Sequence, residues 1–399
     1  MQPARQARIA ANRTTRREQQ KEHPLKTKIF NHIDDVPRQT WTALLGTNSV
    51  TMSWEFWKVV EQSRLNDFEY RHVLFFDDQG HPVGLSSFYS ITTDIAIFAP
   101  AALRAVLNGV RRLFPNFLKW KMLECGTPIT INSPPFVKSD ALSHGEIIDA
   151  LNEVLRRTAR AEGHSMIIVR DFEPSALHVR ENFRRLGYHW VDSLPNTYMD
   201  ISWASPEQYL ASMRSYFRSK LQKHLKRNAE AGVHHRLVDD FHDMAETLCA
   251  QWMVVHEHAS EFQREVLTPD FYRRLSTDLG GQAKVLLFYR GDALLGHALL
   301  LRDRDMLRWL YVGREVAAND SLYIYVAHKV VETAILLGAK RLELGLTTYP
   351  IKQDLGAQVT PIKIALRASW WLINPFVGLG YALLNRVPAP DPRKVFKSS

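Results

Sequence analysis

The residue types best suited to chemistry lie in the last third of the chain, and their pattern favours proton transfer. Glu343 stands among leucines in the run RLELGL at 341–346. A carboxylate buried by such neighbours has a raised pKa and can act as a general base, whereas a solvent-facing one is only a surface residue. Further candidates for proton transfer or relay, each of a type that also packs in cores, are His297, Tyr311 and Tyr349.

Lys352 is the main candidate for substrate binding. It follows the turn-like string TTYP at 347–350. A lysine placed directly after a tight turn can hold a phosphate or a carboxylate. The alternative is an ordinary exposed loop lysine.

Other kinds of chemistry find little support. His256 and His258 are two residues apart, which splits them across a helix instead of pairing them as zinc ligands. The sequence contains no P-loop, dinucleotide-binding fingerprint or nucleophile elbow. Cys125 and Cys249 are the only cysteines, so a disulfide framework is excluded and a reducing compartment is favoured. We expect no metal and no permanently bound cofactor.

The elements that must position these residues repeat one plan. Segments 73–90 and 285–302 both read as a hairpin with glycine in its turn and again in its second strand. Each hairpin is followed by a helical run closed by glycine, a short apolar strand and a final strand. In chain order these are 147–162, 165–169 and 188–201 in the first copy, and 322–337, 341–346 and 357–366 in the second.

Matched elements in matched order favour one fold used twice, although hairpins and capped helices are common in general. We therefore predict an α/β chain (α+β, with mixed sheets) built from tandem duplicated domains. The length of 399 residues and the 45% hydrophobic content suffice for two cores.

The net charge of +9 is unevenly placed. Residues 1–30 carry eight lysines and arginines against two glutamates, and this arm is expected to be disordered. It could bind an anionic membrane or nucleic acid, or only favour solubility. Because no apolar run follows it, no signal peptide is expected, and the predicted location is cytoplasmic or peripheral on the cytoplasmic membrane face.

A second basic segment is predicted to be one helix over 206–231. Ser205 is its expected N-cap and Gly232 its expected stop. Arg214 and Arg218 flank the apolar stripe and could reach a cleft between the domains as substrate-binding residues. A solvated basic face is the alternative.

Three strings carry a family resemblance: SYFRSKLQKHLKRNAEAGV, WLYVGRE and TTYPIKQDLGAQVTPI. With the element order over 31–366, they resemble the GNAT superfamily, and within it the double-domain members of the Fem-like and "acetyltransferase involved in cellulose biosynthesis" type. The resemblance implies transfer of an acyl group from acyl-CoA or acyl carrier protein to an amine. An amine attacks only when neutral, so the site needs a base and donors for the oxyanion.

The chain departs from the family at one loop. GNAT acetyltransferases cradle the coenzyme A pyrophosphate with a glycine-rich loop at a helix N-terminus. The corresponding stretch, REVAAN at 314–319, keeps Arg314 as a candidate substrate-binding residue but lacks both glycines, and Asp320 and Ser321 resemble helix caps. A carrier-protein or tRNA donor is therefore harder to dismiss.

The C-terminal segment 368–385 runs without a charge but is interrupted by Asn374, Pro375 and two glycines. We expect a broken helical hairpin at a membrane interface or over a lipid tunnel, the alternative being packing on the second domain's sheet. A long-chain amine acceptor would explain this apolar segment. The resemblance then admits a ceramide-synthase-like reaction that acylates a sphingoid-type base.

Three functions remain open at this point. The first is an N-acyltransferase. The second is a Fem-type aminoacyl-tRNA-dependent ligase acting on a peptidoglycan precursor, and the third is a non-catalytic binding module. The expected division is a basic arm (1–30), a first GNAT-like domain (31–203), a basic connecting helix (204–232), a second GNAT-like domain with the active site (233–366) and an apolar C-terminal element (367–399).

Overall fold

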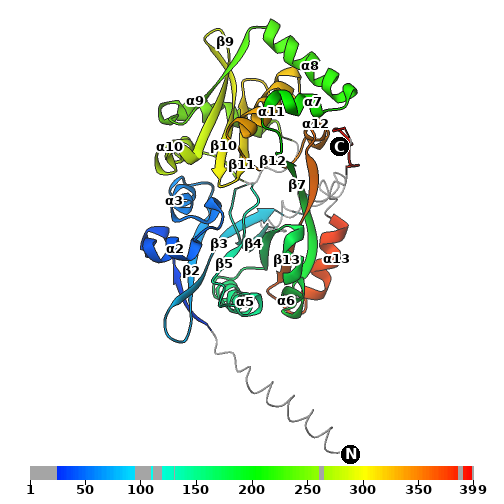
Figure 1. Ribbon diagram of the computed structural model, residues 1–399. Helices are drawn as coiled ribbons and strands as arrows, with labels where there is room; N and C mark the ends of the chain where they lie inside the picture. Colours follow the sequence, from blue (N-terminus) through cyan, green and yellow to red (C-terminus); the bar gives the residue numbers. More distant parts are fainter. Residues whose placement is uncertain are drawn as a thin grey trace, which may run out of the picture.

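The computed structural model describes residues 25–94, 109–110, 119–129, 131–259, 265–384 and 390–397 (Figure 1). Most elements of the first copy lie in one half of the molecule and most of those of the second copy lie in the other half. The predicted arm lies outside the described residues up to residue 24. Its last five residues instead form strand β1, Lys26–Phe30, which pairs with β2 at the edge of the sheet.

One continuous sheet of thirteen strands runs through both copies. The remaining strands of the first copy are β2 (Glu69–Phe76), β3 (Pro82–Asp94), β4 (Lys119–Cys125), β5 (Phe136–Lys138), β6 (Met166–Phe172) and β7 (His189–Asp200). Those of the second copy are β8 (Val233–Val238), β9 (Ala283–Arg290), β10 (Ala293–Asp303), β11 (Met306–Arg314), β12 (Arg341–Gly345) and β13 (Gln358–Ala368). The order is β1-β2-β3-β4-β6-β13-β7-β12-β11-β10-β9-β8, with β5 paired to β3.

The two copies exchange their last strands. Strand β13, from the second copy, pairs antiparallel with β6 of the first, and β7, from the first copy, pairs antiparallel with β12 of the second. The exchanged strands also pair with each other over the length of β13. Each half therefore completes its sheet with a strand of the other half, which leaves neither with an unpaired inner edge.

The sequence repeat is confirmed in three dimensions. The hairpins β2–β3 and β9–β10, the helices α5 (His144–Ala161) and α11 (Ser321–Leu336), and the strands β6 and β12 occupy matching places. Strands β4 and β6 of the first copy are parallel, as are β11 and β12 of the second. This is the pairing that a strand, crossover helix and strand produce.

Helices cover both faces of the sheet (Figure 1). Besides α5 and α11, the α-helices include α2 (Arg38–Leu45), α3 (Trp54–Gln62), α6 (Arg180–Arg185), α7 (Pro206–Ser212), α8 (Ser215–Glu230), α9 (Ala245–Glu257), α10 (Pro269–Asp278), α12 (Tyr349–Asp354) and α13 (Asn374–Leu384). Short 3-10 helices are η1 (Ile33–Asp35), η2 (Val50–Met52), η4 (Pro174–Val179), η5 (His242–Met244) and η6 (Gly280–Gln282).

The basic segment expected as a single helix is two helices. The break lies at Met213, whose backbone is extended because it bridges to Phe396 near the C-terminus. The cap predictions hold, since the Ser205 side chain accepts a hydrogen bond from the Gln208 backbone and Gly232 has a φ of 71° after α8. The apolar stripe alone could not reveal the break, because a contact distant in sequence imposes it.

The hydrophobic core crosses the boundary between the copies. One cluster joins Trp41 and Trp57 of the first copy to Phe271, Tyr272 and others of the second. Helix α3 packs against α10 in the same region. Buried aromatic residues contribute several kcal/mol each in such packing, so we infer that the two copies fold as one body.

The C-terminal segment differs from the expected helical hairpin. Its first residue ends β13, the chain turns at 370–373, and α13 packs one side on β13 and β7 through a cluster that includes Val377. Residues 385–389 lie outside the described residues. In the part of the chain that the structure describes, no helix has the length and apolar character needed to cross a membrane.

The close packing between α9 and strand β11 gives a first prediction. A Cβ at position 313 would lie 2.8 Å from the backbone nitrogen of Trp252 and would also overlap the His297 ring. We expect Gly313→Ala to lower the free energy of unfolding by about 3 kcal/mol, as overpacking does. Gly281→Ala is the control, because no atom lies within 4 Å of that added Cβ. Equal urea denaturation curves for the two variants would contradict the prediction.

Candidate active site

Glu343 lies at the centre of the molecule, where the two copies meet. It is 1% exposed on β12. One carboxylate oxygen accepts hydrogen bonds from the Asn132 backbone at 3.2 Å and from the Asn196 side chain at 2.5 Å, and the other accepts from Arg308. The burial expected from the sequence is found, but the apolar surroundings are not. Both oxygens are engaged, so Glu343 is poorly placed to take a proton from a substrate.

Arg308 on β11 holds this centre together. It pairs with Glu343 and with Asp303 of β10, and it donates to the Asn132 carbonyl at 2.7 Å. Asp303 in turn accepts from Ser49 at 2.5 Å and from the Val50 backbone at 2.8 Å. Burial alone would lower the pKa of Arg308, but the two carboxylates outweigh burial and raise it. The network joins three strands of the second copy to two segments of the first.

Asp171 is a candidate catalytic residue that the sequence interpretation missed. It has a φ of 68°, which is unfavourable for a residue other than glycine, near the end of β6. Burial raises its pKa to about 6, although neighbouring Arg170 acts in the opposite direction. Its Oδ2 atom has no hydrogen-bond partner among the described residues. Strain, a shifted pKa and a free oxygen together mark functional carboxylates.

Lys352 is a buried amine, not an exposed loop lysine. Its side chain lies on α12, 3% exposed, and donates to the Leu346 carbonyl. Burial lowers its pKa to about 7, and the charge of Glu343 acts in the opposite direction. The two residues before α12, Thr347 and Thr348, have φ angles of 60° and 44°. This left-handed turn is what directs the short helix, and with it Lys352, back into the protein.

The same junction includes two of the predicted tyrosines. Tyr311 on β11 donates to Glu265 at 2.5 Å, and the charge of Glu265 acts on Arg170, the neighbour of Asp171. Tyr349, on the helix of Lys352, donates to the Pro195 carbonyl at 2.9 Å. The charge of Glu343 thus acts on both Asp171 and Lys352, whereas Tyr311 and Tyr349 bind Glu265 and the Pro195 carbonyl.

His297 is not part of this group. Its two ring nitrogens contact the Tyr272 hydroxyl at 3.1 Å and the Gln251 amide oxygen at 3.0 Å. Complete burial lowers its pKa to about 3, so it is neutral at physiological pH and already has two partners. The structure assigns it to packing beneath α9, contrary to the expected role as a base.

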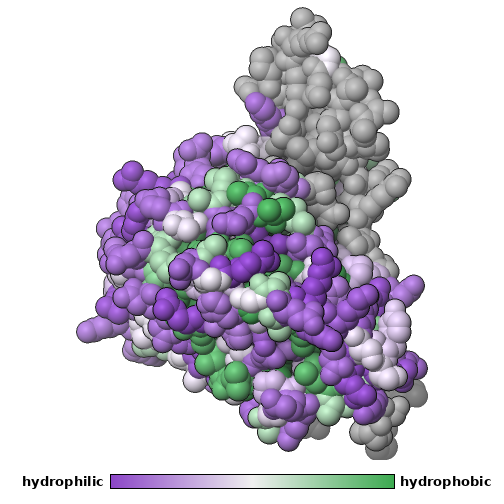
Figure 2. Space-filling model, turned by 90° about the horizontal axis from the view of Figure 1, so that it is seen from above, coloured by the Kyte–Doolittle hydropathy of each residue, from purple (hydrophilic) through white to green (hydrophobic). Residues whose placement is uncertain are grey.

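Arg214 and Arg218 also lie elsewhere. Arg214 caps the break between α7 and α8 and donates to the Phe396 carbonyl at 3.1 Å, while Arg218 turns back to the Ala211 carbonyl. The molecule seen from above, the side on which α8 lies in Figure 1, is mostly hydrophilic (Figure 2). These two arginines therefore face the surface near the C-terminal segment and do not reach the junction.

The loop before α11 is occupied by the protein's own charges. Asp320 accepts from the Tyr323 backbone at 3.0 Å, as the cap prediction requires, and Arg314 pairs with Asp320 at 3.0 Å. Burial would raise the pKa of Asp320, but the Arg314 hydrogen bond and the backbone donors lower it. A pyrophosphate at this helix N-terminus would have to displace a carboxylate, so the residues here fit that group poorly.

The two copies differ where their parallel strands separate. β11 pairs with β12 only through Arg308 and then continues to Arg314, whereas β4 ends at Cys125, its last residue paired with β6. In the described structure, the second copy therefore extends one strand beyond its partner and the first copy does not. An extended chain with amide groups can add beside such a strand.

The described residues contain no group of three or more histidines, cysteines or carboxylates arranged to hold a metal ion.

Comparisons with known proteins show sequence and fold similarity to this chain. Residues 215–353 match the model of the acetyltransferase (GNAT) domain. A protein named 8-amino-7-oxononanoate synthase 2, from Mycobacterium tuberculosis, is 26% identical over 80% of this chain, and the chain spans only 42% of that relative's length.

Two solved structures share the fold at low identity. One is the C-terminal domain of an Agrobacterium fabrum protein named as a lysylphosphatidylglycerol synthetase, with a TM-score of 0.52, 10% identity, and coverage of 87% of this chain and 95% of that one. The other is FemX, with a TM-score of 0.52, 12% identity, and coverage of 84% and 96%. Residues 215–353 therefore match a GNAT domain, and the chain as a whole shares the fold of these two structures.

The buried charge network gives a second prediction. Arg308→Met leaves Glu343 and Asp303 buried without their cation, and we expect a loss of about 3–5 kcal/mol in the free energy of unfolding. Adding Glu343→Leu should recover part of the loss, because it removes one of the unpaired charges. Chemical denaturation of both variants measures the free energy of unfolding. If Arg308→Met alone were as stable as the parent protein, the prediction would be contradicted.

Lys352 gives a third prediction. Its pKa is about 7 when folded and near its ordinary value of 10.5 when unfolded, so the unfolded chain binds more protons between these values. Burial of the charged Lys352 amine therefore lowers the free energy of unfolding by its full amount below about pH 7. This loss becomes smaller as the pH rises towards 10.5. We expect Lys352→Met to raise the free energy of unfolding by about 2 kcal/mol near pH 6 and by much less near pH 10. A gain independent of pH would contradict this cause.

Proposed function

We propose that the chain is an N-acyltransferase that moves an acyl group from acyl-CoA or acyl carrier protein to a long-chain or lipid amine, a ceramide-synthase-like reaction. One observation carries the proposal. Asp171 and Lys352, buried groups with pKa values of about 6 and about 7, lie around the same carboxylate beside the separating strands β11 and β12. Proton transfer at neutral pH requires groups of this kind.

The proposed step uses these two residues in opposite roles. The amine nitrogen forms a bond to the acyl carbon, and its proton passes to the ionised carboxylate of Asp171. The carbon–sulfur bond breaks, and the leaving sulfur takes a proton from the ammonium of Lys352. Glu343 acts through its charge, which raises the pKa of both neighbours, and Tyr311 and Tyr349 hold the surrounding backbone and side chains in place.

The extended strand β11 supports a donor with an amide-containing arm. Acyl-CoA and acyl carrier protein present the acyl group on the same arm, which could lie along residues 309–314 as an added strand. Because Asp320 and Arg314 occupy the N-terminus of α11, a donor without a free pyrophosphate fits this loop better. We therefore favour the carrier protein over free acyl-CoA as the donor, with the active site in the second copy.

The apolar C-terminal segment supports a lipid acceptor. Its turn and the outer side of α13 are exposed, which suits peripheral contact with the cytoplasmic membrane face. The name of the Agrobacterium fabrum protein describes synthesis of a lipid that carries an amino acid, an example of this fold applied to a lipid.

The direct test is the release of free thiol from short- and long-chain acyl-CoA and acyl carrier protein, with and without a sphingoid base. We expect release that depends on the amine and on one range of chain length, faster with the carrier protein. The product should be the amide, identified by mass. Absence of amine-dependent release with every donor would overturn the proposal.

The roles of Asp171 and Lys352 predict a bell-shaped pH profile for kcat/KM, with limbs near the pKa values of about 6 and about 7. Asp171→Asn should lower kcat by about a hundredfold or more and remove the acidic limb. Asp192→Asn, at an exposed position where the carboxylate pairs with Lys363, is the control and should leave the profile unchanged. An unaltered acidic limb in Asp171→Asn would exclude it as the base.

A second candidate is a Fem-type ligase that takes an amino acid from aminoacyl-tRNA to a peptidoglycan precursor. The blocked phosphate loop favours it, and so does the basic N-terminal sequence. Binding of tRNA that weakens steeply with salt, together with no thiol release, would support this candidate. Ligand binding without turnover of any donor would instead indicate a binding module.

A further inference from the structure

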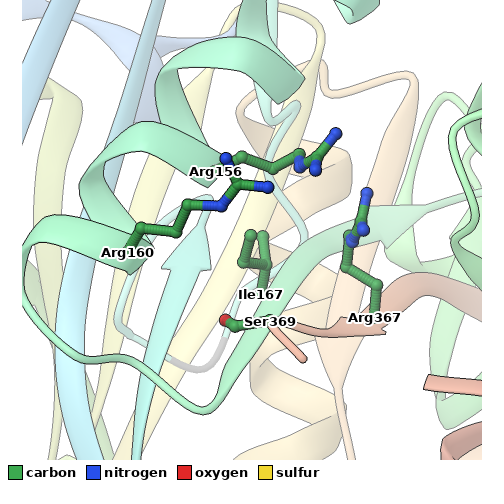
Figure 3. Close-up of a pocket in the computed structure, with 5 residues that line it drawn as sticks. All are labelled: Arg156, Arg160, Ile167, Arg367 and Ser369. Atoms are coloured by element: carbon green, nitrogen blue, oxygen red, sulfur yellow. The ribbon is translucent and has the colours of Figure 1, made fainter. Parts of the chain in front are cut away.

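Three arginines surround a small pocket at the end of the first copy, away from the junction. Arg156 and Arg160 come from α5, and Arg367 and Ser369 lie at and just after the end of β13. These side chains enclose almost no free space, and the depression that they line is open to solvent, with Ile167 as its apolar floor. Figure 3 shows the guanidinium groups of Arg156 and Arg160 on one side and that of Arg367 on the other.

Polar atoms at this pocket lack partners. Arg367 is 8% exposed, and its Nε atom is buried without a hydrogen bond, as are the Ser369 hydroxyl and the hydroxyl of Tyr188 beneath Arg367. Within the described ranges, none of the three arginines has an ion pair with a carboxylate, and Arg367 donates only to the Leu186 carbonyl. Unsatisfied buried donors are costly, so a native protein retains them where a ligand can satisfy them.

The charges at the pocket all have one sign. Burial lowers the pKa of Arg367, and the charges of Arg156 and Arg160 lower it further. Tyr188 also lies against Arg367, and burial raises the pKa of its hydroxyl, so the hydroxyl is neutral. A bound anion would offset the repulsion among the three guanidinium groups. Guanidinium groups around a hydroxyl match a phosphate group, which accepts several charge-assisted hydrogen bonds at once.

An exposed apolar turn begins at the same place. Directly after Ser369, Trp370 and Trp371 are 70% and 78% exposed. The apolar surface continues through exposed residues of the turn and of α13, which are Leu372, Ile373, Phe376 and Leu379. Tryptophan beside aliphatic residues is the combination that enters the interface of a bilayer, and adjacent arginines suit its phosphates.

We propose that this end of the molecule binds the surface of an anionic phospholipid bilayer, with one headgroup phosphate in the pocket of Arg156, Arg160 and Arg367 and with Trp370 and Trp371 in the interface. The proposal rests on the proposed function in one respect, because a lipid acceptor gives the enzyme a reason to dock on membranes. Docking here would leave the junction of the copies free to receive the donor from the cytoplasm.

The test is flotation of the full chain with vesicles of phosphatidylcholine alone or with about one third phosphatidylglycerol, without any acyl donor. We expect binding to the anionic vesicles only. Arg156→Gln with Arg160→Gln, and separately Trp371→Ser, should each weaken binding by about tenfold or more.

Matched controls separate this site from general charge and folding effects. Arg180→Gln with Arg184→Gln removes the same charge from exposed positions on α6, which pair with Glu181, and should bind as the parent does. Leu177→Ser removes an exposed apolar side chain elsewhere. Circular dichroism and thermal melting establish that each variant is folded. Equal loss of binding in the controls would overturn the site.

Other occupants would give different results. Stabilisation by inorganic phosphate without vesicle binding would indicate a free-anion site and overturn the proposal. Self-association in sedimentation that Trp371→Ser abolishes, without vesicle binding, would identify a second copy as the occupant. Absence of both self-association and vesicle binding would indicate that the chain covers this surface itself. Thiol release with a short-chain amine in solution is measured separately, so vesicle binding and catalysis can fail independently.

Discussion

The buried pairing of Arg308 with Glu343 and Asp303 is the interaction on which the arrangement of the two copies depends. These three charges come from adjacent strands of the second copy, and their remaining hydrogen bonds reach backbone and side-chain groups of the first. A buried charge without its partner is strongly destabilising, so the network is stable only when both copies are in place. The exchanged strands β7 and β13 impose the same condition on the backbone.

This construction explains why the candidate site lies between the copies. The network keeps the charge of Glu343 near Asp171 from the first copy and near Lys352 from the second. Burial moves the pKa of an acid upwards and that of an amine downwards, which brings both into the range where protons move at neutral pH. A surface site could not shift these pKa values as far, because water would screen the charges and solvate the ions.

The copies have the same plan but different surfaces. Only the second extends a strand past its parallel partner, and its helix N-terminus is closed by Asp320 and Arg314. Only the first has α13 on its sheet, with the arginine pocket and the exposed tryptophans beside it. We propose that the second copy is arranged to bind the acyl donor and the first copy to bind a lipid surface.

The sequence alone determined the local elements and their repetition, because apolar periodicity, glycine stops and caps such as Ser205 and Asp320 act over a few residues. It also indicated Lys352 and Glu343, which stand beside recognisable turns and apolar runs. It could not reveal the strand exchange, the break at Met213, the partner of Glu343 or the importance of Asp171. The break at Met213 and the amide partners of Glu343 depend on contacts between residues more than a hundred positions apart. Its arginine partner is 35 positions away on a neighbouring strand, and only the tertiary structure decides whether a buried carboxylate meets a leucine or an arginine.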